Sequence, residues 1–184
     1  MGYRKITNLQ IDHPLLLFKE VIASEKIHGT STHITFTSIT LVCKEKGWQF
    51  RISSGGIVHN EFIFMMNTRY KLSTDVMTKL AEITKDQDVE SIDIYGEGYG
   101  GRCQNMNDVY GPLNFIAFEV CKIIAIGDEK KECWLGIERA ARFCEQLGLP
   151  FVFFEKGPAT IEWLDAQRNR PSEQAKRNGC GDNK

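Results

Sequence analysis

A lysine is placed in a short, glycine-ended segment between two stretches that favour β-strand. Residues 20–24 (Glu-Val-Ile-Ala-Ser) precede it, and residues 32–36 (Thr-His-Ile-Thr-Phe) follow it. The β-branched residues on both sides and the turn-forming Gly29 predict two strands that meet near Lys26. A lysine held at a strand end can present its amine to a cleft, where it is a candidate nucleophile. The alternative is an exposed lysine before a hairpin turn, which is the usual place for a lysine.

The size and charge of the chain restrict its class. Its 184 residues, of which 42% are hydrophobic, suit one domain with a real core, with or without an appendage. The net charge of −1 excludes a strongly basic protein, so any contact with nucleic acid must come from a local patch. Apolar runs such as residues 15–18 are too short to span a membrane, and no charged-then-apolar leader pattern is present. We therefore expect no membrane association.

Cysteine usage indicates the redox environment. Six cysteines are scattered through the chain without a C-x-x-C pair. This pattern favours reduced thiols in an intracellular, cytoplasmic protein over a disulfide framework or a zinc site. Several of these cysteines are expected to act as small core residues.

Periodicity predicts a strand-rich first half and a mixed second half. The clearest helix ends at Gly148 and Pro150, a glycine just past the last turn and then a proline. The polar tail, residues 172–184, is predicted to be an exposed loop. The predicted strands are 19–25, 32–37, 39–44, 47–53, 60–65, 91–95, 114–125 and 151–154, and the predicted helices are 74–85, 131–147 and 160–169.

Four segments follow one another in an order that makes Lys26 unusual. They are Lys26-Ile27-His28-Gly29, then Phe50-Arg51-Ile52-Ser53-Ser54-Gly55-Gly56, then Ile94-Tyr95-Gly96-Glu97-Gly98-Tyr99-Gly100-Gly101, and finally Phe115-Ile116-Ala117-Phe118-Glu119-Val120. A lone K-x-H-G is weak, whereas K-x-H-G, Y-G-E-x-x-G-G and F-x-A-F-E in this order are specific. Together they resemble the covalent nucleotidyltransferase superfamily of ligases and capping enzymes.

Within that superfamily the chain looks most like the RNA ligase 2 family. Most DNA ligases and capping enzymes have aspartate between the motif lysine and glycine, and His28 in that place is typical of the RNA ligase branch. The motifs cover roughly residues 20–125. The resemblance implies an α+β fold, an ATP-grasp-like nucleotidyltransferase core of antiparallel sheets with flanking helices around a nucleotide cleft. We expect residues 1–184 to form one adenylyltransferase domain, incomplete at its C-terminus.

The resemblance also implies a reaction. Lys26 would attack the α-phosphate of ATP, form a lysyl-AMP phosphoramidate and release pyrophosphate. The attacking amine must be neutral, and because a free lysine has a pKa of about 10.4, nearby positive charge or burial must lower it. Mg²⁺ or Mn²⁺ would provide such charge and neutralise phosphate, although the sequence identifies no ligands for the metal. The AMP would then pass to an RNA 5′-phosphate, which would be joined to a 3′-hydroxyl.

Further site residues follow from the motif match. Glu97 would bind the ribose or help to place the metal, the alternative being a solvated turn carboxylate. His28 would hold the lysine turn and touch phosphate, or be purely structural. Glu25 and Ile27 flank the nucleophile and are assigned to nucleotide binding; the backbone of Glu25 would contact the adenine, and its carboxylate would either share in this or be solvated.

An aromatic and an arginine complete the predicted nucleotide site. Phe118 matches an aromatic that stacks on adenine, the alternative being a core residue. Arg51 would contact phosphate or RNA, or be an exposed strand arginine, and alignment on the glycine pair places Ser53 in the arginine position instead. Strand alternation puts residues 114, 116 and 118 on one face, and 115, 117 and 119 on the other.

Two motifs of the family are not found after Phe118. These are an E-G-x-V strand and a K-x-K strand; Glu155-Lys156-Gly157 is not the first, and Lys44-Glu45-Lys46 precedes the third segment. We therefore expect the chain to be the N-terminal portion of a longer ligase, which alone adenylylates itself poorly because phosphate-binding lysines stabilise the transition state. The alternatives are a DNA ligase or capping-type nucleotidyltransferase, and a degenerate nucleotide- or RNA-binding module.

Overall fold

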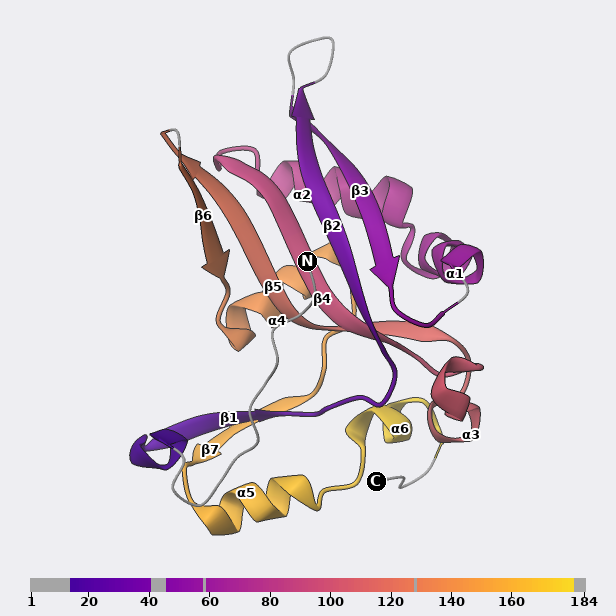
Figure 1. Cartoon of the computed structure of the whole chain (residues 1–184), viewed down its shortest axis with the longest axis vertical. Helices are drawn as coiled ribbons and strands as arrows, with labels where there is room; N and C mark the ends of the chain where they lie inside the picture. Colours follow the sequence, from indigo (N-terminus) through magenta and orange to yellow (C-terminus); the bar gives the residue numbers. More distant parts are fainter. Residues whose placement is uncertain (1–13, 41–45, 58, 128, 181–184) are drawn as a thin grey trace.

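Two antiparallel sheets form the framework of the protein. The computed structural model describes residues 14–40, 46–57, 59–127 and 129–180. A five-stranded sheet has the order β3-β2-β4-β5-β6, and a two-stranded ribbon pairs β1 with β7 (Figure 1). The strands are β1 (Glu20–Ser24), β2 (Thr30–Thr40), β3 (Lys46–Ser54), β4 (Val89–Tyr99), β5 (Asn114–Ile126), β6 (Glu129–Trp134) and β7 (Phe154–Pro158).

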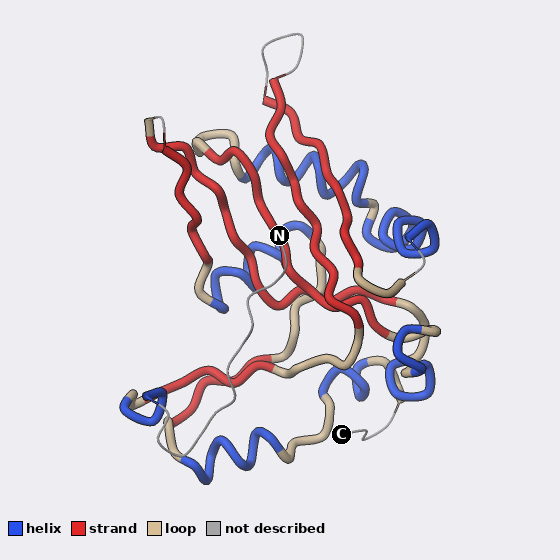
Figure 2. Tube along the Cα trace, viewed as in Figure 1, coloured by secondary structure: helices blue, strands red, loops and turns tan. Residues whose placement is uncertain are grey.

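The helices divide between the large sheet and the ribbon, as the blue segments of Figure 2 show. Three helices, α1, α2 and α4, contribute to the core on one face of the large sheet. Helix α5 lies beside the ribbon, and α6 lies next to the chain that follows β1 (Figure 1). The helical elements are η1 (Pro14–Leu17), α1 (His59–Tyr70), the π-helical turn η2 (Leu72–Val76), α2 (Met77–Ile83), η3 (Cys103–Asn105), α3 (Asn107–Tyr110), α4 (Ile137–Leu147), α5 (Ile161–Arg168) and α6 (Glu173–Arg177).

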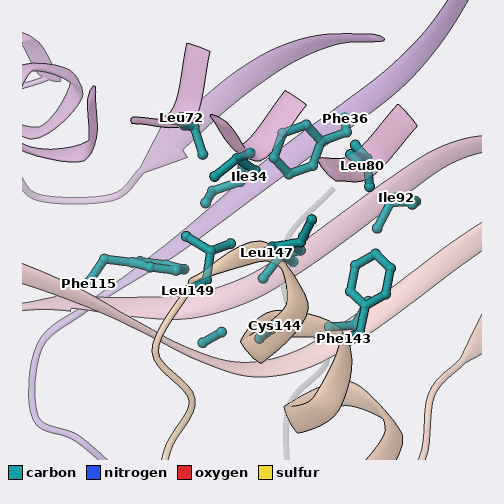
Figure 3. Close-up of a cluster of buried hydrophobic side chains, with 14 of the residues drawn as sticks. Ile34, Phe36, Leu72, Leu80, Ile92, Phe115, Phe143, Cys144, Leu147 and Leu149 are labelled. Atoms are coloured by element: carbon teal, nitrogen blue, oxygen red, sulfur yellow. The ribbon is translucent and has the colours of Figure 1, made fainter. Parts of the chain in front are cut away.

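The main core fills the space between the large sheet and its three helices (Figure 3). Alternate residues of β2 and β4 point into it, as the period of a strand requires. Helix α4 contributes one apolar stripe, and its C-terminal Gly148 adopts the left-handed conformation that ends the helix. Fully buried members include Ile34, Phe36, Leu72, Leu80, Ile92, Phe115 and Cys144.

A second, smaller core ties the ribbon region to the large sheet. It lies at the end of β4 and near the start of β5, and it joins the segment before β2 to α3 and α6. Its buried members are Ile27, Tyr99, Tyr110, Ile116, Val152 and Ala175. Three of these, Ile27, Tyr99 and Ile116, lie inside the motif segments. This second core therefore determines how the motif segments face one another.

Several predicted elements are confirmed. Strands β1, β3 and β5 match the predictions at 19–25, 47–53 and 114–125 within one residue at each end. The predicted helix at 160–169 is α5, and the Thr160 hydroxyl caps it by accepting a hydrogen bond from the Trp163 backbone N–H. The pair of strands at 32–37 and 39–44 is one strand, β2, and residues 41–45 lie outside the described residues.

Four predicted elements are wrong. The predicted strand at 151–154 is not one, because Phe151 forms only an isolated bridge with Ala117 and β7 begins at Phe154. Residues 60–65 are part of helix α1, not a strand, and the helical spacing of the buried Phe62 and Met66 explains why. Residues 129–134 are the edge strand β6 rather than the start of a helix; its charged, exposed side chains are typical of a protected sheet edge. The tail contains helix α6, whose Gln174 and Ala175 are buried, so it is not an exposed loop.

The state of the cysteines agrees with the sequence analysis. The five cysteines in the described ranges are free thiols, and Cys103, Cys121 and Cys144 are buried; Cys43 lies outside those ranges. Within the part of the chain that the structure describes, no helix is both long and apolar enough to cross a membrane.

Candidate nucleotide site

Lys26 is exposed between two neighbours that the fold anchors. The backbone N–H of Glu25 donates to the Phe153 carbonyl oxygen at 2.8 Å. The side chain of Ile27 is 2% exposed in the second core. The chain alternates between inward and outward side chains here, so anchoring these neighbours directs the lysine amine outward. Lys26 lies two residues after the end of β1, and the rigid placement of its amine stays a prediction.

Gly29 lets the lysine segment lie directly on strand β4. A Cβ atom at Gly29 would collide with the Gly98 carbonyl oxygen and come within 3.2 Å of Tyr99 Cβ. Only a residue without a side chain permits this approach. The glycine of the first motif therefore brings the backbone after Lys26 against the strand that contains Glu97.

Glu97 lies on β4, at the level of Ser31 on β2 and Ile116 on β5. Its Oε2 atom is buried and has no hydrogen-bond partner among the described residues. Burial raises the pKa of Glu97 to about 7, and the positive charge of Lys26 acts in the opposite direction. Lys26 and Glu97 are thus close enough to interact electrostatically, and the carboxyl is poised to exchange a proton near neutral pH.

The glycine before Glu97 serves the opposite face of the sheet. A Cβ atom at Gly96 would collide with the ring of Phe115 and the Ile116 carbonyl oxygen. In the Y-G-E motif, the glutamate places a carboxylate on one face of the sheet. The glycine leaves room on the other face for the Phe115 ring, which packs on Phe62.

Phe118 lies in a β-bulge. Gly96 is opposite Ala117 and Tyr95 is opposite Glu119, so Phe118 is the extra residue of β5. It is half-buried and packs on the second core beside Ile27. The bulge corrects the predicted alternation: residues 117 and 119 face opposite sides of the sheet, not the same side. Re-aiming of this kind leaves a partly exposed aromatic ring next to the lysine segment.

Arg51 is exposed on the edge strand β3, opposite Thr35. Glu97 is opposite Ser31, four positions away along β2, which at about 3.3 Å per residue is about 13 Å. Ser53, opposite His33, is half as far along the strand from the level of Glu97. The backbone therefore does not bring Arg51 beside Lys26 and Glu97, and the Ser53 alternative lies closer.

The two remaining predicted site residues, His28 and Glu25, belong to the lysine segment itself. His28 has an exposed side chain, and its backbone N–H donates to the Tyr110 hydroxyl at 3.4 Å. The Glu25 carboxylate accepts hydrogen bonds from the Ser172 hydroxyl and the Gln174 backbone N–H, the latter at 3.2 Å. Glu25 is thus engaged by helix α6 rather than solvated, a contact that motif matching did not anticipate.

A nucleotide and its metal can be tested against these residues. The buried, unpartnered Oε2 of Glu97 needs a donor, and a ribose hydroxyl or a metal-bound water would provide one. The described residues contain no group of three His, Cys, Asp or Glu side chains that could hold a metal ion. Mg²⁺ in nucleotide sites is commonly bound through one or two carboxylates together with the substrate phosphates.

The comparison with protein families identifies the class. A model of the RNA ligase family matches residues 19–180. The chain therefore belongs to the RNA ligase family, and the fold, with antiparallel sheets and flanking helices, is that of nucleotidyltransferase-type RNA ligases. A sequence comparison with curated proteins found no match.

Among solved structures, the chain is similar to an RNA ligase of Naegleria gruberi. A variant of that ligase with ATP and Mn shares 15% identity at a TM-score of 0.58, covering 94% of this chain and 49% of that chain. A variant with AMP and Mn shares 14% identity at a TM-score of 0.56, covering 89% and 46%. A structure with pyrophosphate shares 14% identity at a TM-score of 0.54, covering 86% and 43%. The chain thus spans about half the length of these ligase chains, and the likeness concerns the fold.

Proposed function

We propose that this chain is the nucleotide-binding and nucleophile-bearing part of an ATP-dependent RNA ligase. The observation that supports this best is the pairing of exposed Lys26 with the half-buried carboxyl of Glu97, whose inner oxygen has no partner among the described residues. Membership of the RNA ligase family and the ATP, AMP and pyrophosphate in the related Naegleria structures support the same assignment.

The first chemical step would use Lys26 as the nucleophile. Its neutral Nζ forms a bond to the α-phosphorus of ATP, while the bond from that phosphorus to the bridging oxygen breaks and pyrophosphate leaves with the bond electrons. The attacking nitrogen releases one proton, which passes to solvent water. A divalent ion bound to the phosphates would neutralise their charge and help pyrophosphate to leave.

The other residues would bind and orient the nucleotide. Glu97 accepts a hydrogen bond from the ribose or from metal-bound water, and Phe118 stacks on the adenine from its place in the bulge. Glu25 and Ile27 contribute backbone groups on either side of the nucleophile. Arg51 or Ser53 contacts phosphate or RNA farther along the sheet, and the exposed His28 side chain lies free to reach phosphate.

The later steps would act on RNA. AMP passes from Lys26 to a 5′-phosphate end, and the 3′-hydroxyl of a second end displaces it to seal the strand. With a net charge of −1, the chain would bind RNA through local contacts with the phosphate backbone, and binding would weaken as salt increases. We propose an intracellular location, where such RNA ends occur.

Intact mass spectrometry tests the first step. The purified chain is weighed before and after incubation with ATP and Mn²⁺, and the modified peptide is sequenced. We expect a gain of one adenylate on Lys26, no gain in Lys26→Ala, and an unchanged gain in Lys131→Ala, which removes an exposed lysine on β6. Adenylate that persists in Lys26→Ala would disprove the nucleophile assignment. ATP binding without any adenylate on the wild-type chain would show that further sequence is needed for the step.

A further inference from the structure

Helix α6 joins the two segments that contain Lys26 and Glu97. At its N-terminus the Ser172 hydroxyl and the Gln174 backbone N–H both donate to the Glu25 carboxylate. Ser172 also accepts a hydrogen bond from the Ala175 backbone N–H at 3.0 Å, which caps the helix. The residue directly before Lys26 is therefore fixed to a segment almost 150 positions away in sequence.

The side chain of Gln174 reaches from the same helix to strand β4. Its Nε2 atom donates to the Tyr99 hydroxyl at 3.0 Å and to Asn178 Oδ1 at 3.0 Å. Tyr99 is fully buried and lies two residues after Glu97, on the same face of the strand. Gln174, which is 7% exposed, thus bonds the lysine segment through its backbone and the Glu97 strand through its side chain.

A second connection runs through Tyr110. The Asn178 side-chain amide donates to the Tyr110 carbonyl oxygen at 2.8 Å, and the Tyr110 hydroxyl accepts from the His28 backbone N–H. The Tyr99 and Tyr110 rings pack edge to face, with centroids 5.5 Å apart. The segment around Lys26 is therefore held on both sides of the nucleophile by one hydrogen-bonded group centred on α6.

Packing alone does not require an amide at position 174. An apolar side chain of similar size would fill the same buried space without polar groups to satisfy. Hydrogen bonds instead fix direction and distance, and a satisfied buried network specifies one arrangement of the groups that it joins. The donor at Gln174 Nε2 is used twice, once toward β4 and once within α6.

We propose that Gln174 is a positioning residue, which holds Lys26 against Glu97 by bonding the lysine segment to strand β4. This inference rests on the proposed function, because it takes Lys26 and Glu97 as the working pair. Gln174 touches neither the nucleotide nor the reacting atoms in this role. Its loss leaves the fold in place and lets the lysine amine move away from the carboxyl.

The titration of Glu97 reports this distance without any need for catalysis. The Lys26 charge lowers the pKa of Glu97, so moving the lysine away must raise it further. The Cys103 thiol also lies near this carboxyl, and burial together with the Glu97 charge raises the pKa of that thiol. The carboxyl ¹³C shift of Glu97, followed by NMR from pH 5 to pH 8.5 in the full chain, gives the measurement.

Four variants make the test specific. Gln174→Met removes both side-chain hydrogen bonds at nearly constant size, and Tyr99→Phe removes the bond to β4 from the other side while keeping the buried ring. Lys26→Ala gives the largest expected rise in the pKa of Glu97. Gln146→Met, at an exposed position of α4, is the matched control. Amide NMR spectra show whether each variant is folded. If Gln174→Met does not fold, Tyr99→Phe alone tests the positioning role.

The outcomes separate this proposal from the proposed function. We expect Gln174→Met and Tyr99→Phe to raise the pKa of Glu97 in the direction of Lys26→Ala, with faster hydrogen exchange at the Glu25 and His28 amides and no change in Gln146→Met. A rise in Lys26→Ala alone would overturn the positioning role but keep the lysine–glutamate pair. An unchanged pKa in Lys26→Ala would overturn the pair and with it the positioning role, while the adenylate measurement on Lys26 would decide the proposed function separately.

Discussion

Replacing Glu97 by glutamine should make the chain more stable than the wild type, by an amount that grows as pH rises. Burial raises the pKa of this carboxyl from 4.5 to about 7, so the folded state binds the proton more tightly than the unfolded chain does. The group therefore contributes most to stability below about pH 4.5, and that contribution is lost as pH rises through about 7. At about 1.36 kcal/mol per pH unit, the difference corresponds to at most about 3.4 kcal/mol. Because the carboxyl is only half-buried and solvent screens it, we expect about 1–2 kcal/mol.

Urea unfolding of the wild-type chain and Glu97→Gln, measured from pH 4.5 to pH 8, tests this expectation. The free energy of unfolding of the variant should gain about 1–2 kcal/mol relative to the wild type between these limits. Glu145→Gln, at an exposed position of α4, controls for the loss of one negative charge. A difference between Glu97→Gln and wild type that is constant with pH, or that grows as pH falls, would refute the reasoning.

Three further substitutions test separate parts of the structure. Phe118→Ala should weaken ATP binding by about 1–3 kcal/mol in a calorimetric titration, whereas Phe118→Tyr should not; an equal loss in both would argue against stacking. Gly29→Ala should lower the free energy of unfolding by about 1–3 kcal/mol because its Cβ meets the Gly98 carbonyl oxygen, and Gly55→Ala, whose nearest atom is 3.4 Å away, is the control. Thr160→Ala should cost about 1 kcal/mol by removing the α5 cap, and failure of Thr160→Ser to retain that stability would contradict the capping role.

The sequence predicts those parts of the fold whose cause is local. Strands β1, β3 and β5 have β-branched and aromatic residues between turn signals, and α5 has a capping threonine at its start. The first and third motif segments also lie side by side, because Gly29 lets the backbone after Lys26 approach the Gly98 carbonyl oxygen of β4. These features depend on a few neighbouring residues and one strand pairing.

The errors arise where tertiary contacts decide between two local possibilities. Residues 60–65 have an apolar run compatible with either period, and burial of Phe62 and Met66 under the sheet selects the helix. Residues 129–134 are charged enough for a helix but pair with the exposed edge of β5. The bulge at Phe118 is likewise determined by how β5 pairs with β4, and the hydrophobic pattern of the sequence does not predict it.

The contacts of α6 were missed for a related reason. A helix of five residues is too short to show an amphipathic period, and Ser172 after Pro171 is the one local sign of a helix start. Its partners Glu25 and Tyr99 are far away in sequence, so only the folded structure reveals that the tail supports the lysine segment. Motif matching identifies residues expected to contact the substrate, but it does not identify the residues that hold those side chains in place.

The buried oxygen of Glu97 connects stability with function. An unpartnered, half-buried carboxyl disfavours the folded state near neutral pH, and glutamine of the same shape would avoid most of that cost. The arrangement becomes favourable once a donor reaches Oε2, and a ribose hydroxyl or a metal-bound water from an ATP complex is such a donor. If so, Glu97→Gln should stabilise the free chain above pH 7 and yet bind ATP more weakly. A variant that gained stability and kept full ATP affinity would show that this carboxyl does not contact the nucleotide.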